Sequence, residues 1–386
     1  MSQKQVSRDI NTFSLWQQTS LIASTLIGVG VLTLPRTTSA KLYEAGWLAP
    51  LIGSFWVFLS VWMIAKLSDR FPGKTFIEYS PIVWGSAKHP RLGRWLSLPW
   101  VIGYLLFLYL STAIVARVFG EVVVTSVLLD TPLEVIIITM FLLAQMLCMH
   151  EVDVLARINE LLFPLILFPV LVIAIASFQK AEWNNMLPLY RVPGRALFEG
   201  IYETVYSFSG YEIMLIFYAY AHENQSKVKA GFYGIGIATF VYTLIVLAGI
   251  VVFGYEELQR VSWPTLELVK TTQVPGLILE RLESAFLAVW VAAVFTTVAN
   301  AYYAFVYGLR QLFNKGIQFQ RIISAILFIP LFFIALWPQN IVDIFRASSY
   351  LGIISLYLNL GIPLLYLLVV FARGMGSKAK ERKAGG

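Results

Sequence analysis

Two short stretches of this 386-residue chain interrupt helices that are otherwise apolar, and they decide the fold. Residues 24–35 read Ser-Thr-Leu-Ile-Gly-Val-Gly-Val-Leu-Thr-Leu-Pro, and residues 206–212 read Tyr-Ser-Phe-Ser-Gly-Tyr-Glu. In the first stretch Gly28 and Gly30 weaken the helix, and Pro35 is expected to end it. In the second, serines that bond to nearby carbonyls and a glycine lower the cost of unwinding. Close helix packing through small residues is the alternative interpretation of the glycines.

Ten apolar runs contain or surround these stretches. A helix needs roughly 20 mostly apolar residues to cross a bilayer, and the segments that fit are 12–34, 44–65, 95–127, 133–149, 157–178, 198–220, 231–254, 280–309, 320–338 and 342–371. Backbone groups in lipid must bond internally, so the runs are helices. The alternating pattern of a membrane barrel does not occur. We therefore predict an all-α integral membrane protein with ten transmembrane helices.

Composition excludes several other classes of protein. Of all residues 58% are apolar and only 13% are charged, against about 25% charged in soluble domains. One cysteine, Cys148, allows no disulfide within the chain. Sequence patterns of phosphate loops and nucleophile elbows do not occur, so an enzyme is not predicted. The net charge is +7, and the basic residues lie in short loops between the apolar runs. This pattern is typical of a membrane protein whose loops contact anionic lipid. No nucleic acid is expected as a partner.

Lysine and arginine set the orientation. With a cytoplasmic N-terminus, 19 of these residues fall in cytoplasmic segments and 9 in external ones, which predicts that both termini are cytoplasmic. We predict a single transmembrane domain over 1–371, with a first repeat over about 12–178 and a second over about 198–371, followed by a basic tail over 372–386 that touches anionic lipid. The external loop 255–279 is expected to hold a short helix that caps the bundle.

The two interrupted helices are the first members of two sets of five. Breaks at corresponding places in two halves of a membrane protein indicate a substrate site near the midplane of the bilayer. Backbone N–H groups freed by a break can bind an anion, and freed carbonyls can bind an ammonium group or a cation. An amino acid carries both charged groups on one carbon, so two adjacent broken helices suit it.

The motifs resemble those of a known family. Gly28-Val29-Gly30 with Pro35, and the run 208–212, are similar to the first- and sixth-helix motifs of the amino acid–polyamine–organocation superfamily. More narrowly, nearly the whole chain resembles the B subunit of nutrient germinant receptors of Bacillus-type spores, in the spore germination permease family. The segments that carry this resemblance are 11–13, 28–35, 262–265, 280–284, 295–297 and 336–338.

The resemblance implies a LeuT-type fold, with a 5+5 inverted repeat and broken helices one and six. It also implies binding of a small nutrient germinant, often an amino acid, in a complex with an A and a C subunit. The expected location is the spore inner membrane or the cell membrane. The alternative function is that of an amino acid/cation symporter of the same superfamily.

The resemblance places the substrate site among helices one, three, six and eight. The residues carried over by position are Gly28, Val29, Gly30, Tyr104, Leu108, Phe208, Ser209, Gly210, Thr297 and Ala301. The first-helix residues are expected to face the substrate carboxylate, and the sixth-helix residues its ammonium group and side chain. Tyr104 is expected to donate its hydroxyl to a carboxylate while Leu108 shapes the side-chain pocket, with bundle packing as the alternative. Thr296 and Thr297 resemble sodium-site hydroxyls, with back-bonding to the preceding turn as the alternative.

Buried charges complete the set of candidates. Glu212 is expected to tie the broken sixth helix to the first, or to respond to protons, as the resemblance implies. Arg117 and Glu121 are four residues apart, so they should face and neutralise each other. Glu160 is expected to tether the inner ends of helices. The segment 150–153 lacks a second histidine at helical spacing, so neither a metal nor another cofactor is predicted, while a coupling cation or proton stays open.

Overall fold

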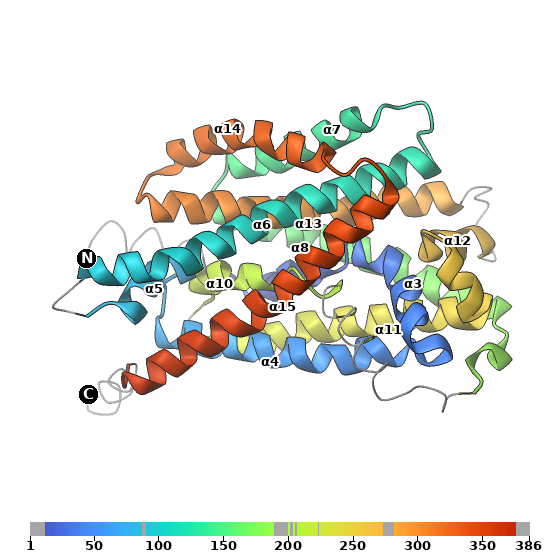
Figure 1. The fold of residues 1–386 in the computed structure, drawn as a ribbon, viewed down its shortest axis with the longest axis horizontal. Helices are drawn as coiled ribbons and strands as arrows, with labels where there is room; N and C mark the ends of the chain where they lie inside the picture. The colour runs from blue at the N-terminus through green and yellow to red at the C-terminus, as the bar shows by residue number, and fades with distance from the viewer. Residues whose placement is uncertain are drawn as a thin grey trace.

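The computed structural model describes residues 12–86, 90–188, 200, 204, 207–222, 224–272 and 282–375, with only the backbone for 282–285. In these residues the structure is almost entirely helical (Figure 1). Phe13 and Ala221, both within the described ranges, form an isolated parallel bridge.

The first half of the chain forms seven helices, counted within the described ranges. They are α2 (Leu15–Leu26), α3 (Gly30–Leu42), α4 (Leu48–Arg70), α5 (Phe76–Trp84), α6 (Pro90–Ser126), α7 (Leu133–Cys148) and α8 (Val152–Ser177). Short 3-10 turns follow at Tyr43–Ala45, Phe178–Lys180 and Trp183–Met186.

In the second half, Gly200, Thr204 and Ser207 are helical, and three short pieces follow: η4 (Tyr211–Ile213), α10 (Met214–Phe217) and η5 (Tyr218–Tyr220). Five helices follow: α11 (Lys227–Arg260), α12 (Pro264–Thr271), α13 (Leu282–Leu312), α14 (Ile317–Leu336) and α15 (Ile341–Ala372). A positive φ of 73° at Gly254 bends α11 near its end. In Figure 1, α12 lies at the opposite end of the bundle from α5, and α15 runs diagonally between these ends.

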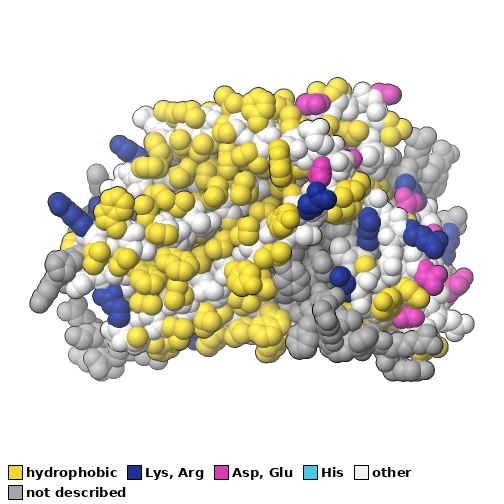
Figure 2. Space-filling model, in the orientation of Figure 1, with side chains coloured by type: hydrophobic (Ala, Val, Ile, Leu, Met, Phe, Trp, Pro, Cys, Tyr) yellow, Lys and Arg dark blue, Asp and Glu magenta, His cyan; other side chains and the backbone are white. Residues whose placement is uncertain are grey.

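Length and apolar composition make this an integral membrane protein. Seven helices in the described residues can span a bilayer, or eight spans if the bent pair of α2 and α3 counts as one, and α7 is a shorter apolar helix. Hydrophobic side chains cover the middle of the face shown in Figure 2, and charged side chains gather toward its two ends. The run 198–220 and the tail 372–386 lie partly outside the described residues, and the division into two repeats stays a prediction.

The predicted end of the first helix at Pro35 is wrong. Proline lies inside α3, which continues to Leu42. Because Pro35 has no N–H, the carbonyl of Val31 loses its usual partner within the helix. The hydroxyl of Thr265, on α12, donates to that carbonyl over 2.6 Å. The short helix expected within 255–279 is present as α12. Through Thr265 it supplies the hydrogen bond that α3 loses at Pro35.

Candidate ligand-binding site between two broken helices

The first break lies between Leu26 and Gly30, where the axes of α2 and α3 differ by 57°. Carbonyls near the end of α2 lose helical partners there, and side chains of α13 replace them. Thr296 donates its hydroxyl to the carbonyl of Ser24 over 3.2 Å, and Thr297 donates to the carbonyl of Thr25 over 3.0 Å. Both threonines also contact the carbonyl of Ala293 in their own helix, so the predicted back-bonding is present as well.

Two large side chains supply further donors to the same break. The indole N–H of Trp290 donates to the carbonyl of Gly28 over 3.1 Å. The hydroxyl of Tyr242, on α11, bonds to the carbonyl of Leu26 and lies 2.9 Å from the carbonyl of Ser207. Tyr242 therefore joins the first broken helix to the sixth.

Neighbouring groups approach the two glycines of the first break closely. A Cβ atom at Gly28 would lie 2.2 Å from the hydroxyl oxygen of Thr297. A Cβ atom at Gly30 would lie 3.0 Å from the hydroxyl of Tyr242 and 3.1 Å from the carbonyl oxygen of Ser207.

The sixth break is centred on Gly210, whose φ of +132° is open to glycine and strained for other residues. Its N–H donates to Oε2 of Glu212 over 2.7 Å, and the hydroxyl of Ser209 donates to Oε1 over 3.2 Å. The side-chain amide of Asn359, on α15, donates to Oε2 over 3.0 Å. The expected tether from Glu212 to the first helix is wrong, because the carboxylate links the sixth segment to α15 instead.

The role predicted for Tyr104 as a donor to a ligand carboxylate is also wrong. This side chain is fully buried, and its hydroxyl donates to the backbone carbonyl of Glu212 over 3.0 Å. Tyr104 instead takes part in bundle packing, which was the alternative interpretation. Its ring lies edge-on to the ring of Phe76, with 5.3 Å between the ring centroids.

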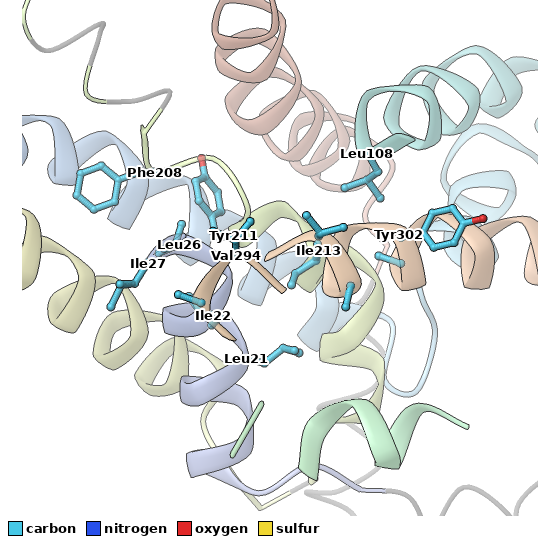
Figure 3. Close-up of a cluster of buried hydrophobic side chains, with 14 of the residues drawn as sticks. Leu21, Ile22, Leu26, Ile27, Leu108, Phe208, Tyr211, Ile213, Val294 and Tyr302 are labelled. Carbon is cyan, nitrogen blue, oxygen red and sulfur yellow. The ribbon is translucent and has the colours of Figure 1, made fainter. Parts of the chain in front are cut away.

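A cavity of about 350 Å³ lies between the two breaks. Lining groups come from α2, α3, α6, the sixth segment, α13 and α15. Among the residues carried over from the sequence, the lining includes Val29, Gly30, Leu108, Ser209, Gly210, Thr297 and Ala301, together with Glu212. Gly28, Phe208 and Thr296 lie behind this lining, and Phe208 packs against Tyr242 with 5.0 Å between ring centroids. Figure 3 shows Phe208 and Leu108 in the buried cluster that surrounds the breaks.

Sequence reasoning missed a buried cluster of neutral polar groups beside the first break. The hydroxyl of Ser24 donates to Oδ1 of Asn159 over 2.5 Å, and Nδ2 of Asn159 donates to Oδ1 of Asn300 over 2.7 Å. Nδ2 of Asn300 donates in turn to the hydroxyl of Thr25 over 2.7 Å. The cluster joins α2, α8 and α13. An isolated amide in each of two apolar runs was the available signal, because polar groups inside a membrane need partners.

The remaining charged candidates lie away from the cavity. Nη1 of Arg117 lies 2.6 Å from Oε2 of Glu121, and Nε of Arg117 donates to the carbonyl of Pro338. Oε2 of Glu160 accepts a hydrogen bond of 2.9 Å from Gln17, which joins α8 to α2. In the described residues no three His, Cys, Asp or Glu side chains come together as metal ligands.

A bundle whose first and sixth helices break around one cavity defines the LeuT-type class of membrane proteins. Two of the solved structures that match this fold each contain a bound ligand. MhsT in complex with L-phenylalanine gives a TM-score of 0.65 at 12% identity, over 94% of this chain and 99% of that one. A substrate-bound Na⁺-coupled sialic acid symporter gives 0.67 at 11% identity, over 92% and 80%.

A family model described as "Spore germination protein" matches residues 12–344, and the chain belongs to this family of spore germination permeases. It is 30% identical over 365 residues to spore germination protein YndE of Bacillus subtilis, which covers 94% of this chain and 97% of that protein. Spore germination protein B2 of B. subtilis is 26% identical over 86% of this chain and 88% of its own length. GerLB of Bacillus cereus is 25% identical, over 94% of each chain. The family resemblance and the LeuT-type fold inferred from the sequence are confirmed.

Proposed function

We propose that this chain is the nutrient-binding membrane subunit of a spore germinant receptor and that the nutrient is an amino acid held between the two breaks. The observation that carries the proposal is that one cavity touches both breaks, since Gly30 and Gly210 both line it. The volume of about 350 Å³ falls in the range of small-molecule pockets.

The chemistry of the two breaks suits the two charged ends of an amino acid. The first N–H groups of α3 have no partner inside that helix, and they carry the positive end of its dipole. Val29 and Gly30 bring these groups to the cavity, where they bind the carboxylate. The carboxylate of Glu212 also lines the cavity and attracts the ammonium group. Leu108 and Ala301 surround the side chain.

Signalling follows if the nutrient prefers one packing of the bundle, because a ligand shifts an equilibrium only through its differential affinity for two states. The partners in this proposal are the A and C subunits of the receptor, in the inner membrane of the spore, with both termini cytoplasmic. The names of the curated relatives support the assignment, since all of those described above are spore germination proteins.

A symporter of amino acids and cations is the second candidate function. The observation that favours it is the position of Thr296 and Thr297, whose hydroxyls meet the carbonyls of Ser24 and Thr25 at the first break. Oxygen groups of this kind can bind a sodium ion. Uptake of labelled amino acid by vesicles that contain this chain alone would support transport, whereas binding without uptake would support the receptor.

Binding of labelled amino acids to the purified full chain tests the site. Ala301→Leu fills the side-chain end of the cavity, so larger amino acids should lose affinity by roughly 10- to 200-fold while smaller ones bind as before. Ala288→Leu is the matched control, because Ala288 lies on the same helix and is exposed. Equal affinities for every amino acid in wild type and Ala301→Leu would place the site elsewhere.

Cysteine labelling tests the proposed orientation. Lys74 precedes α5 and Lys270 lies in α12, and both are exposed. A cysteine at position 74 should react with a membrane-impermeant thiol reagent from the cytoplasmic side, and one at position 270 from the opposite side. The native Cys148 is buried and gives little background. Labelling of both positions from one side would overturn the orientation.

A further inference from the structure

The cavity continues along α3 beyond the two breaks, and its lining there is polar. Thr33, Arg36 and Thr37 line it from α3, and Ser348 and Ser349 line it from α15. Residues 33, 36 and 37 are spaced by three and four positions, so they share one face of α3. Phe345 lies one turn before the two serines. These two helix faces, with Ser111 on α6, form the part of the lining that we term the polar end of the cavity.

A guanidinium group lies in this polar end, and no acidic side chain among the described residues forms an ion pair with it. Cζ of Arg36 lies 5.0 Å from the centre of the Phe345 ring, an arrangement in which the ring attracts the cation. No carboxylate in the described part of the chain pairs with Arg36. A guanidinium group is planar and carries five N–H donors, two of which can bind both oxygens of one carboxylate at once.

Several hydroxyls in the polar end also have unused hydrogen-bonding capacity. Those of Thr33, Ser111, Ser348 and Ser349 make no hydrogen bond with any described residue. They come from three different helices and line the same cavity as Arg36.

Among the described residues that line the cavity, Glu212 is the acidic one. Its carboxylate oxygens already accept hydrogen bonds from Gly210, Ser209 and Asn359. Within the described part of the chain, the positive charge of Arg36 is therefore available to a ligand.

We propose that Arg36 and the surrounding hydroxyls form an oxyanion subsite that binds a carboxylate of the nutrient. The proposal rests on the function proposed above and adds an anion-binding group to the same site. Arg36 lies six residues after Gly30, about 9 Å along the axis of α3. Side chains of a helix lean toward its N-terminus, so the guanidinium reaches back toward an amino acid bound at the first break. The carboxylate comes from an acidic side chain of the nutrient or from its α-carboxylate.

Binding to the purified full chain distinguishes these two sources. The probes are L-alanine and two pairs in which a carboxylate replaces an amide: aspartate with asparagine, and glutamate with glutamine. If Arg36 binds a side-chain carboxylate, Arg36→Gln should lower the affinity for aspartate or glutamate by about 10- to 100-fold. The affinities for alanine, asparagine and glutamine should stay unchanged. If Arg36 binds the α-carboxylate, the affinities for all amino acids that wild type binds should fall together by a similar factor. Both results support the subsite.

Two further variants keep the test decisive. Arg346→Gln removes the same charge from α15, where Arg346 is exposed and pairs with Asp343 over 3.3 Å, and it should leave every affinity unchanged. Arg36→Lys keeps the charge but loses the planar array of donors, so it should lower the same affinities by a smaller factor. If Arg36→Gln elutes as an aggregate in size-exclusion chromatography, Arg36→Lys replaces it in the test.

The outcomes separate this proposal from the proposed function. Unchanged affinities in both Arg36 variants, or an equal loss in Arg346→Gln, would overturn the subsite while amino acid binding by wild type stands. If wild type binds no amino acid in the panel, the proposed function fails and the subsite fails with it.

Discussion

The two breaks line the same cavity, but different groups stabilise them. At the first break, backbone carbonyls accept hydrogen bonds from other helices, through Thr297 and Trp290 on α13 and Tyr242 on α11. At the sixth, the N–H of Gly210 donates to Glu212, two residues further along the same segment. The first break therefore depends on the surrounding bundle, while the sixth provides much of its own cap. It follows that side-chain substitutions around the first break should disturb the fold more.

Gly28→Ala should have the largest effect. The new Cβ would overlap the hydroxyl of Thr297 at 2.2 Å, and moving that hydroxyl removes the donor to the carbonyl of Thr25. Overpacking and a buried unsatisfied carbonyl each cost about 1–3 kcal/mol. We expect a clear fall in the melting midpoint of the purified protein and in its abundance in membranes, measured by immunoblot.

Gly103→Ala is the matched control for that substitution, because a Cβ atom there meets no atom within 4 Å. It should melt at or slightly above the wild-type temperature, since alanine favours a helix over glycine by about 1 kcal/mol. Equal midpoints for Gly28→Ala and Gly103→Ala would contradict the tight packing of the first break.

Glu212→Gln should have the next largest effect, at the sixth break. The carboxylate accepts three hydrogen bonds, and an amide places an N–H₂ group against at least one of those donors. A buried donor left without its partner costs about 1–3 kcal/mol. We expect a lower melting midpoint with unchanged nutrient preference. Adding Asn359→Asp supplies an acceptor for the new amide and should recover part of the loss; a shifted nutrient preference at normal stability would show that Glu212 selects the ligand.

The positions of both breaks could be predicted from the sequence because unusual residues mark them. Gly28, Gly30 and Gly210 stand in apolar runs, and each is a glycine for a reason visible in the structure: close approach at the first two and a positive φ at the third. The helical bundle could be predicted from the hydrophobic runs, and a short helix could be expected within 255–279, where α12 begins at Pro264. The positions of helices and of their breaks can be predicted from local sequence, because they depend on residues within the helix itself.

The partners of the breaks could not be predicted in the same way. Tyr242 and Trp290 are aromatic residues in apolar helices, where sequence gives no distinction between packing and hydrogen bonding. Tyr104 shows the converse error, because its hydroxyl bonds to a backbone carbonyl rather than to the cavity. Pro35 lies inside a helix because Thr265, 230 positions later, supplies a donor. Each of these contacts depends on how distant helices pack.

Tyr242→Phe tests the contact that the two breaks share. The substitution removes one hydroxyl, which bonds to the carbonyl of Leu26 and lies 2.9 Å from that of Ser207. A hydrogen bond of this kind contributes about 0.5–1.5 kcal/mol, so the fall in melting midpoint should be smaller than for Gly28→Ala. Tyr350→Phe, at an exposed position on α15, is the control and should change nothing. Equal midpoints for the two phenylalanine variants would mean that Tyr242 packs but does not join the breaks.

Thr265→Val should have the smallest effect, and it tests how far the dependence on neighbouring helices extends along α3. The substitution keeps the side-chain shape but removes the donor to the carbonyl of Val31, at a cost of about 1 kcal/mol. Thr271→Val is the matched control, because its hydroxyl bonds only to Leu268 in the same helix. Pro35→Ala returns an N–H to Val31, so in that background Thr265→Val should lower the melting midpoint less than in wild type. An equal loss in both backgrounds would show that Thr265 acts through packing of α12, and that α3 tolerates its proline without help from a distant helix.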